Sequence, residues 1–341
     1  MSTQTKARGA VTRALREGTV AGDLARALVR GARPVFAALE ERCFGNAPPA
    51  LPPLFIVGLP RAGTTVVYQT ICHCFRVSFV PELVQYAPIA PAFATWVAHK
   101  AHPEYRSTFT SVYGSSPGLA SPSEGVMWNL WFDKDRGYEN TDELSPAIAA
   151  AVVGTVGRVE RIGGGPFVNK NLRNDQRVRL LAEMFPNSRF LIVVRDPFAV
   201  AKSLLLGRAA LAGGFAEWFS IKPRDYESFR AAAPTVQVAR QVSGLVRDLA
   251  DDIRTVGRDR FAVVAYEDFC RDPARFTTDL ETFMAHDSFV RRAAATDIAK
   301  PTGSRPVALD AAILDELRRA VEMHAPAECL DALECSWLGK T

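Results

Sequence analysis

The stretch Leu54–Tyr68 constrains the fold of this chain more than any other part of the sequence. Four apolar residues lead to Gly58, four further residues follow, and Gly63 then opens an apolar helical segment. Two glycines at this spacing, between a strand and a helix, are typical of a loop whose backbone N–H groups wrap a phosphate. The sequence therefore predicts a phosphate-binding loop over residues 58–65.

The residue after the second glycine indicates which nucleotides such a loop suits. Enzymes that use nucleoside triphosphates place Lys at this position, where its ammonium group holds the β- and γ-phosphates. Here Thr64 follows Gly63, and the positive charge lies at Arg61 instead. We therefore expect a nucleotide donor that binds through its phosphates and has no γ-phosphate to transfer.

Apolar runs alternate with helical patterns along the rest of the chain. We predict strands at 54–57, 76–80, 167–169, 190–194 and 261–265, and helices at 63–75, 148–162, 175–185, 197–206 and 236–256. The run 190–194 is apolar throughout, as expected of a strand buried on both faces of a parallel sheet. This order predicts an α/β fold of P-loop type, with three layers and a mostly parallel central sheet flanked by helices.

Residues 1–45 are expected to form a basic helical arm outside the main domain. Up to Phe44 the arm carries eight Lys or Arg and four Asp or Glu, an excess equal to the net charge of +4 of the whole chain. The Pro-rich stretch 46–53 cannot continue a helix, so it separates the arm from a single domain at 54–341. Within this domain we expect a donor-binding core at about 54–285 and an insertion at about 88–145. The aromatic residues of the insertion either line the binding site or fill the core.

The sequence also bears on the location of the protein. No apolar run is long enough to span a membrane, and the N-terminus lacks the apolar core of a signal peptide. The six cysteines are scattered and form no zinc-binding set, so we expect reduced thiols and a cytoplasmic location. The arm is expected to pack on the domain, and the alternative is weak contact with the inner face of the membrane. No nucleic-acid partner is expected, and the oligomeric state is left open.

Five polar residues lie at or just past the ends of the predicted strands. They are Arg61, Glu82, Lys170, Arg195 and Tyr266. Ligands of parallel α/β sheets bind at the carboxyl ends of the strands. We therefore expect these five side chains to share one site.

Three motifs resemble those of the PAPS-dependent sulfotransferases, and especially the bacterial branch of that family, over about residues 54–285. PAPS is 3′-phosphoadenosine-5′-phosphosulfate, the sulfuryl donor of these enzymes. The segment 60–65, Pro-Arg-Ala-Gly-Thr-Thr, is similar to the family's 5′-phosphosulfate loop. Val-Arg-Asp-Pro at 194–197, followed by Ser203, resembles the 3′-phosphate site, and Tyr-Glu-Asp at 266–268 resembles the segment whose Tyr contacts the adenine.

The resemblance implies an in-line transfer of a sulfuryl group from PAPS to an acceptor hydroxyl, without a metal, which releases adenosine 3′,5′-bisphosphate. It implies that Glu82 is the general base and that Arg61 and Lys170 stabilise the leaving bisphosphate. The donor-binding residues that it implies are Arg61, Ala62, Gly63, Thr64, Thr65, Arg195, Ser203 and Tyr266. The implied acceptor is a carbohydrate, a glycolipid or a secondary metabolite.

Several alternatives stay open at this level. Glu124, in Ser-Pro-Ser-Glu, is a second candidate for the general base. The segment Arg195-Asp196-Pro197 would also suit an ordinary helix start. Val66 stands where the animal branch of the family has an aromatic residue, and Lys300–Arg305 is only loosely similar to the basic loop that closes over the nucleotide there. The rival functions are a P-loop nucleotide kinase and a non-catalytic nucleotide-binding scaffold.

Overall fold

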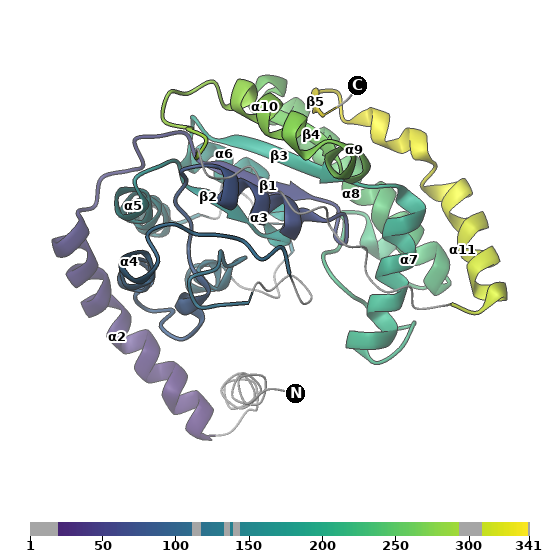
Figure 1. The fold of residues 1–341 in the computed structure, drawn as a ribbon. Coiled ribbons are helices and arrows are strands. Elements are labelled where there is room, and N and C mark those ends of the chain that lie inside the picture. Colours follow the sequence, from purple (N-terminus) through teal and green to yellow (C-terminus); the bar gives the residue numbers. More distant parts are fainter. Residues whose placement is uncertain (1–19, 111–116, 133–136, 139–143, 293–308, 340–341) are drawn as a thin grey trace.

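A parallel β-sheet forms the centre of the fold (Figure 1). The structure is a computed structural model that describes residues 20–110, 117–132, 137–138, 144–292 and 309–339. Within these residues the sheet has five strands in the order β2-β1-β3-β4-β5, and each neighbouring pair runs parallel. The strands are β1 (Leu54–Gly58), β2 (Val168–Lys170), β3 (Arg189–Val194), β4 (Phe261–Ala265) and β5 (Ser336–Leu338).

Aromatic packing holds the centre of the sheet together. Phe55 of β1 is fully buried, and its ring centroid lies 5.7 Å from that of Phe190 on β3 and 6.3 Å from that of Phe167. Phe190 also stacks on Phe261 of β4 at 4.9 Å. The apolar runs of β1, β3 and β4 are buried because helices cover both faces of the sheet.

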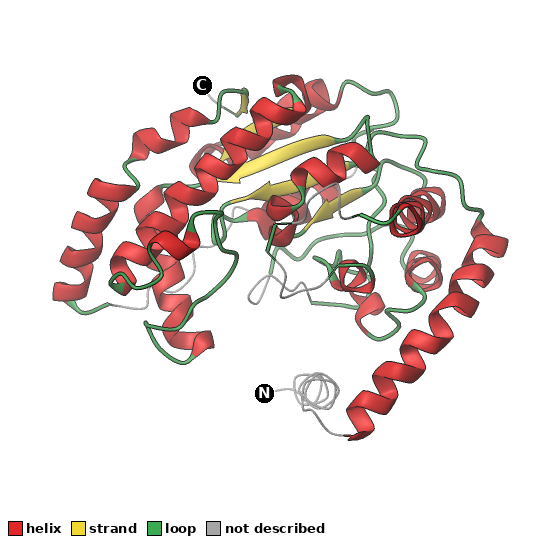
Figure 2. Ribbon diagram, turned by 180° about the vertical axis from the view of Figure 1, so that it is seen from behind, coloured by secondary structure: helices red, strands yellow, loops and turns green. Residues whose placement is uncertain are grey.

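The helices form one layer on each side of the sheet (Figures 1 and 2). In front of the sheet in Figure 1 lie α3 (Thr64–Cys74), α9 (Tyr266–Arg271) and α10 (Pro273–Met284). Behind it lie α6 (Val178–Met184) and α8 (Pro234–Val256), and both α7 (Pro197–Gly207) and α11 (Ala311–His324) pack against α8. This three-layer arrangement confirms the predicted α/β fold of P-loop type.

Three further helices lie on the β2 side of the molecule. α4 (Pro91–Ala101) packs on α5 (Pro146–Gly163), and α2 (Val20–Phe44) contacts both. The buried Glu40 fixes the end of α2, because its carboxylate accepts a hydrogen bond of 2.9 Å from the Phe93 N–H. The first turns of α2 project beyond the other helices (Figure 1). None of the helices in the described ranges has both the length and the apolarity needed to cross a lipid bilayer.

The sheet differs from the sequence prediction in two places. The predicted strand at 76–80 does not form, and Ser78 instead makes a single parallel bridge with Phe167. Phe75 and Pro81, on either side of this segment, bridge to two other parts of the chain, so no continuous ladder develops. The strand β5 was not predicted because its three residues are too few to show a hydrophobic period.

Candidate functional site

The loop after β1 is held in a tight and partly strained conformation. Gly58 has a φ of 125°, and Gly63, the N-cap of α3, has a φ of 87°. A Cβ at Gly58 would lie 2.2 Å from the carbonyl oxygen of Val193 on β3, so no side chain fits there. Arg61 has a φ of 69°, a left-handed conformation that is uncommon for a residue other than glycine. Backbone strain of this kind clusters at ligand-binding sites.

Tyr266, the first residue of α9, lies against this loop. A Cβ at Gly63 would come within 2.3 Å of Tyr266 Cδ2, so only glycine leaves room for the ring. The guanidinium of Arg195 lies over the same ring, 4.9 Å from its centroid. The ends of β3 and β4 therefore bring Arg195 and Tyr266 to the loop that follows β1.

Arg61 connects the loop to α7. Its Nε donates a hydrogen bond of 3.0 Å to Ser203 Oγ, although 142 residues separate the two. Asp196 caps the same helix by accepting a hydrogen bond of 2.7 Å from the Ala199 N–H, as expected of an ordinary helix start. The Arg195 Nε is buried and makes no hydrogen bond within the described residues, and it lies 3.9 Å from Glu267 Oε1.

Lys170, at the end of β2, reaches the loop from the other side. Its Nζ lies 2.5 Å from Glu124 Oε1 and 3.4 Å from Thr65 Oγ1. The Thr65 hydroxyl also donates a hydrogen bond of 2.7 Å to Glu124 Oε1. The Lys170 side chain is only 3% exposed, and a cation so far removed from water needs an anionic partner.

Glu82 lies on a separate segment. It opens the short 3₁₀ helix Glu82–Gln85, is 2% exposed, and donates its backbone N–H to the Ser121 carbonyl at 2.8 Å. Burial is the main cause that raises the pKa of the Tyr68 phenol well above its ordinary value, and the charges of Glu124 and Glu82 add to it. The charges of both candidate bases therefore raise the pKa of the same buried phenol.

The structure thus gathers most of the residues that the sequence singled out around one loop, and Glu82 lies on a separate segment. Arg61 contacts Ser203, and Lys170 contacts Thr65. Both Arg195 and Gly63 contact Tyr266. Ala62 belongs to the loop itself, and Thr64 is the first residue of α3. The functional roles of these residues stay predictions, whereas their proximity is a property of the fold.

Asp175 is a residue of this region that the sequence does not reveal. Both oxygens of its buried carboxylate lie 3.1 Å from the Gly58 nitrogen, which donates to them. Burial raises the pKa of this carboxyl well above its usual value, and the Gly58 N–H and the Lys170 charge act in the opposite direction. In the sequence Asp175 only marks the start of the helix predicted at 175–185. Its partner is a backbone group 117 residues away, so no local pattern could have identified it.

Replacing Asp175 with Ala should lower the free energy of unfolding by about 1–3 kcal/mol, because it leaves the buried Gly58 N–H without its acceptor. Urea denaturation followed by circular dichroism measures this change. The exposed Glu183 of α6 offers a control, and Glu183→Ala should cost less than about 0.5 kcal/mol. Equal stability of Asp175→Ala and the wild type would show that the carboxylate does not hold the loop.

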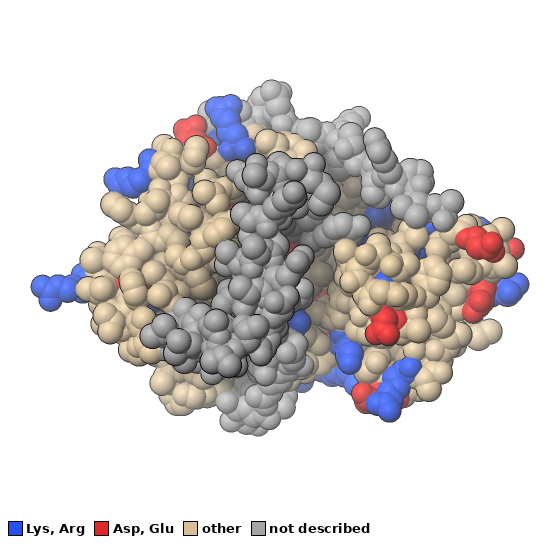
Figure 3. Space-filling view, turned by 90° about the horizontal axis from the view of Figure 1, so that it is seen from below, with Lys and Arg blue, Asp and Glu red and all other residues tan. Residues whose placement is uncertain are grey.

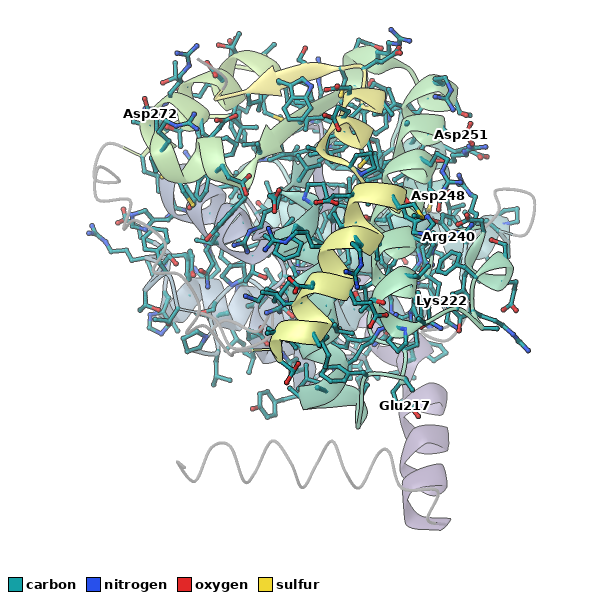
Figure 4. The ribbon with its side chains drawn as sticks, turned by 90° about the vertical axis from the view of Figure 1, so that its right-hand side faces the viewer. Glu217, Lys222, Arg240, Asp248, Asp251 and Asp272 are labelled. Carbon is teal, nitrogen blue, oxygen red and sulfur yellow. The ribbon has the colours of Figure 1, made fainter. Side chains whose placement is uncertain are left out.

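Ion pairs fix the polypeptide that connects α7 to α8. The backbone N–H of Arg224 donates to Asp248 Oδ2 at 2.8 Å, and its Nη2 lies 3.0 Å from Asp252 Oδ1. Arg240 pairs with Asp225 at 3.3 Å. Figure 4 labels Arg240, Asp248 and Asp251 along α8, and also Lys222 of the connecting segment. These contacts tie Arg224 and Asp225, in the connection between α7 and α8, to α8.

The aromatic residues of the insertion have two different environments. Trp128 is 1% exposed and donates its Nε1–H to Asn169 Oδ1 at 2.8 Å, so it belongs to the core. In contrast, Trp96 is 43% exposed. Tyr86, just before the insertion, and the apolar Leu119 within it are each 54% exposed. Figure 3 shows the molecule from below. Its left-hand part, where α4 lies in Figure 1, carries few charged side chains among the described residues.

Other expectations concern metals, thiols and the basic loop. In the described ranges, no three His, Cys, Asp or Glu side chains are grouped so that they could hold a metal ion. Each of the six cysteines is a free thiol. The segment Lys300–Arg305 lies outside the described residues, as do residues 1–19 of the arm.

Comparisons with known proteins identify relatives of this fold. A sequence model of the sulfotransferase family matches residues 52–288. No curated protein sequence matches the chain. The crystal structure of sulfotransferase STF9 from Mycobacterium avium is similar with a TM-score of 0.52 and 17% sequence identity, and the match covers 89% of this chain and 83% of that one. Sulfotransferase STF1 from Mycobacterium tuberculosis H37Rv matches with a TM-score of 0.46 and 14% identity, over 94% of this chain and 86% of that one. The first of these similarities supports a shared fold.

Proposed function

Because the chain belongs to the sulfotransferase family, we propose that it transfers a sulfuryl group from PAPS to an acceptor hydroxyl and releases adenosine 3′,5′-bisphosphate. The observation that carries this proposal is the convergence of three cations on one loop. Arg61 lies in the loop, Lys170 approaches Thr65, and Arg195 packs on the tyrosine that covers Gly63. Cations gathered around a helix N-terminus suit a ligand with phosphate groups at two ends.

The residues present fit such a donor. The N-terminus of α3, with Gly63, Thr64 and Thr65, would hold the 5′ end through backbone N–H groups and hydroxyls. Arg195 and Ser203 would hold the 3′-phosphate, and Tyr266 would contact the adenine. The buried Arg195 Nε supports this assignment, because it has no hydrogen-bond acceptor within the described residues. Bound PAPS supplies the sulfuryl group and a leaving bisphosphate.

Catalysis in this proposal consists of positioning and electrostatic stabilisation. The acceptor oxygen attacks sulfur as the bond between sulfur and the bridging oxygen breaks, and negative charge then develops on the leaving phosphate. Arg61 and Lys170 would stabilise that charge. Glu82 would take the proton of the acceptor hydroxyl.

We assign the base role to Glu82 rather than to Glu124 because of where the two carboxylates lie. Glu124 contacts Lys170 and Thr65, which are donor-side groups in this proposal. A base must face the acceptor, on the side of sulfur opposite the leaving group. Glu82 lies on a separate segment, in the 3₁₀ helix Glu82–Gln85, and makes the better candidate.

For the acceptor we keep the class predicted from the sequence: a carbohydrate, a glycolipid or a secondary metabolite. Two exposed side chains, Tyr86 and Leu119, lie next to the Glu82 helix: Tyr86 ends it, and the Leu119 carbonyl accepts the Leu83 N–H. Their position beside the proposed base supports an acceptor with apolar surface or sugar faces. A cytoplasmic location, the division into an arm at 1–45 and a domain at 54–341, and weak membrane contact through the arm stay predictions.

Titration calorimetry with adenosine 3′,5′-bisphosphate and with ATP tests the donor. The bisphosphate should bind at least about tenfold more tightly than ATP, which corresponds to about 1.4 kcal/mol. Preference for ATP would instead favour a P-loop nucleotide kinase. Tight binding of the bisphosphate without turnover of any hydroxyl acceptor in a broad screen would favour a non-catalytic scaffold.

A further inference from the structure

One carboxylate oxygen occupies the point where Lys170 and Thr65 converge. Glu124 Oε1 lies 2.5 Å from Lys170 Nζ and 2.7 Å from Thr65 Oγ1, so a single oxygen accepts hydrogen bonds from both groups. The Lys170 side chain is 3% exposed, and the Glu124 side chain is 27% exposed. The anion of this pair therefore has access to solvent that the cation lacks.

The backbone on both sides of Glu124 is held in place. The Ser123 N–H donates to the Val80 carbonyl at 2.8 Å, next to the bridge between Pro81 and Pro122. On the other side, a Cβ at Gly125 would lie 2.2 Å from Asn171 Nδ2, so the chain packs closely there. We therefore expect that, if the carboxylate leaves Lys170, only its own side chain rotates and the segment that carries it stays in place.

If the proposed function is correct, the donor needs the same two groups, Lys170 and Thr65. The present inference rests on that function. An oxygen of the donor's 5′ end would accept hydrogen bonds from Lys170 and Thr65, as Glu124 Oε1 does in this structure. Two anions at this point would repel each other, because like charges a few ångströms apart inside a protein are strongly destabilising.

We propose that Glu124 is a positioning residue that the donor displaces. Without the donor the carboxylate neutralises the buried Lys170 and holds it against Thr65. The 5′ end of the donor takes over both contacts, and Glu124 turns toward solvent. The buried cation therefore has one anionic partner at a time, and Glu124 competes with the donor for it.

The test compares nucleotide affinities of the full-length wild type and Glu124→Gln by calorimetry. Adenosine 3′,5′-bisphosphate should bind at least about tenfold more tightly to Glu124→Gln, because no charged competitor has to leave Lys170. Adenosine 3′-monophosphate lacks the 5′ end, so its affinity should not change. Glu227→Gln, which removes one charge from an exposed pair with Arg230, should leave both affinities as in the wild type.

Other results would contradict either the displacement of Glu124 or the proposed function. Unchanged or weaker binding of the bisphosphate to folded Glu124→Gln would overturn the displacement. An equal gain in affinity for the monophosphate would show that the effect does not involve the 5′ end, and it would also overturn the displacement. If Glu124→Gln does not fold, Glu124→Asp decides instead, since a shorter carboxylate should also raise the affinity for the bisphosphate alone. If the wild type binds neither nucleotide, the proposed function fails, and the displacement falls with it.

Discussion

Replacing Arg61 with Ala should lower kcat about a hundred- to a thousandfold and change the affinity for adenosine 3′,5′-bisphosphate far less. The physical reason is that negative charge develops on the bridging oxygen only as the bond to sulfur breaks. A cation aimed at that oxygen stabilises the transition state more than the bound donor, and loss of one such group typically costs a factor of 10²–10³. The two quantities are measured by initial rates with PAPS and by calorimetry with the bisphosphate.

The left-handed backbone at Arg61 calls for a second variant. Its φ of 69° is unfavourable for Ala, so Arg61→Ala alone mixes the loss of charge with a change in the loop. Arg61→Gly accepts this conformation and should show the same loss of kcat. Arg230→Ala, at an exposed position, is the matched control. If donor affinity falls as much as kcat/KM in both Arg61 variants, the guanidinium binds the ground state and its assignment to the leaving group is wrong.

The second large effect is expected at Glu82. Glu82→Gln keeps the size of a side chain that is 2% exposed but removes its ability to accept a proton, so kcat should fall by a factor of about 10²–10⁴. The affinity for adenosine 3′,5′-bisphosphate should stay within about twofold of the wild type, since a base on the acceptor side does not touch the donor.

Comparison with Glu124→Gln makes this prediction decisive. If Glu82→Gln retains most of the wild-type kcat while Glu124→Gln loses it without a change in nucleotide affinity, Glu124 is the base. That result would also contradict the proposed displacement of Glu124 by the donor. A large loss in Glu82→Gln with tighter nucleotide binding in Glu124→Gln would support both assignments.

Most of the fold could be predicted from local patterns. The apolar runs of β1, β3 and β4 mark strands, because burial on both faces leaves no polar position in them. The helices α7 and α8 both begin at Pro, a residue favoured in the first helical turn. Where the local pattern was weak, the prediction failed. The segment 76–80 is apolar enough for a strand, but its one bridge, at Ser78, and the bridges of the flanking Phe75 and Pro81 go to three different parts of the chain.

The residue types of the candidate site follow from the sequence alone. A glycine pair with Thr64 in place of Lys, an arginine after a buried strand, and a tyrosine after the next are local features whose chemistry suits a phosphate-rich donor. The order of strands and helices also predicts that these features meet at one edge of the sheet, because the carboxyl ends of parallel strands lie together.

Only the tertiary structure decides which of these groups touch. The hydrogen bond from Arg61 to Ser203 spans 142 residues, that from Gly58 to Asp175 spans 117, and that from Lys170 to Thr65 spans 105. Contacts over such separations leave no period in the sequence, since they depend on how whole strands and helices pack. The loop in which Thr64 takes the place of lysine is thus determined by the sequence, and the residues that contact this loop are determined by the fold.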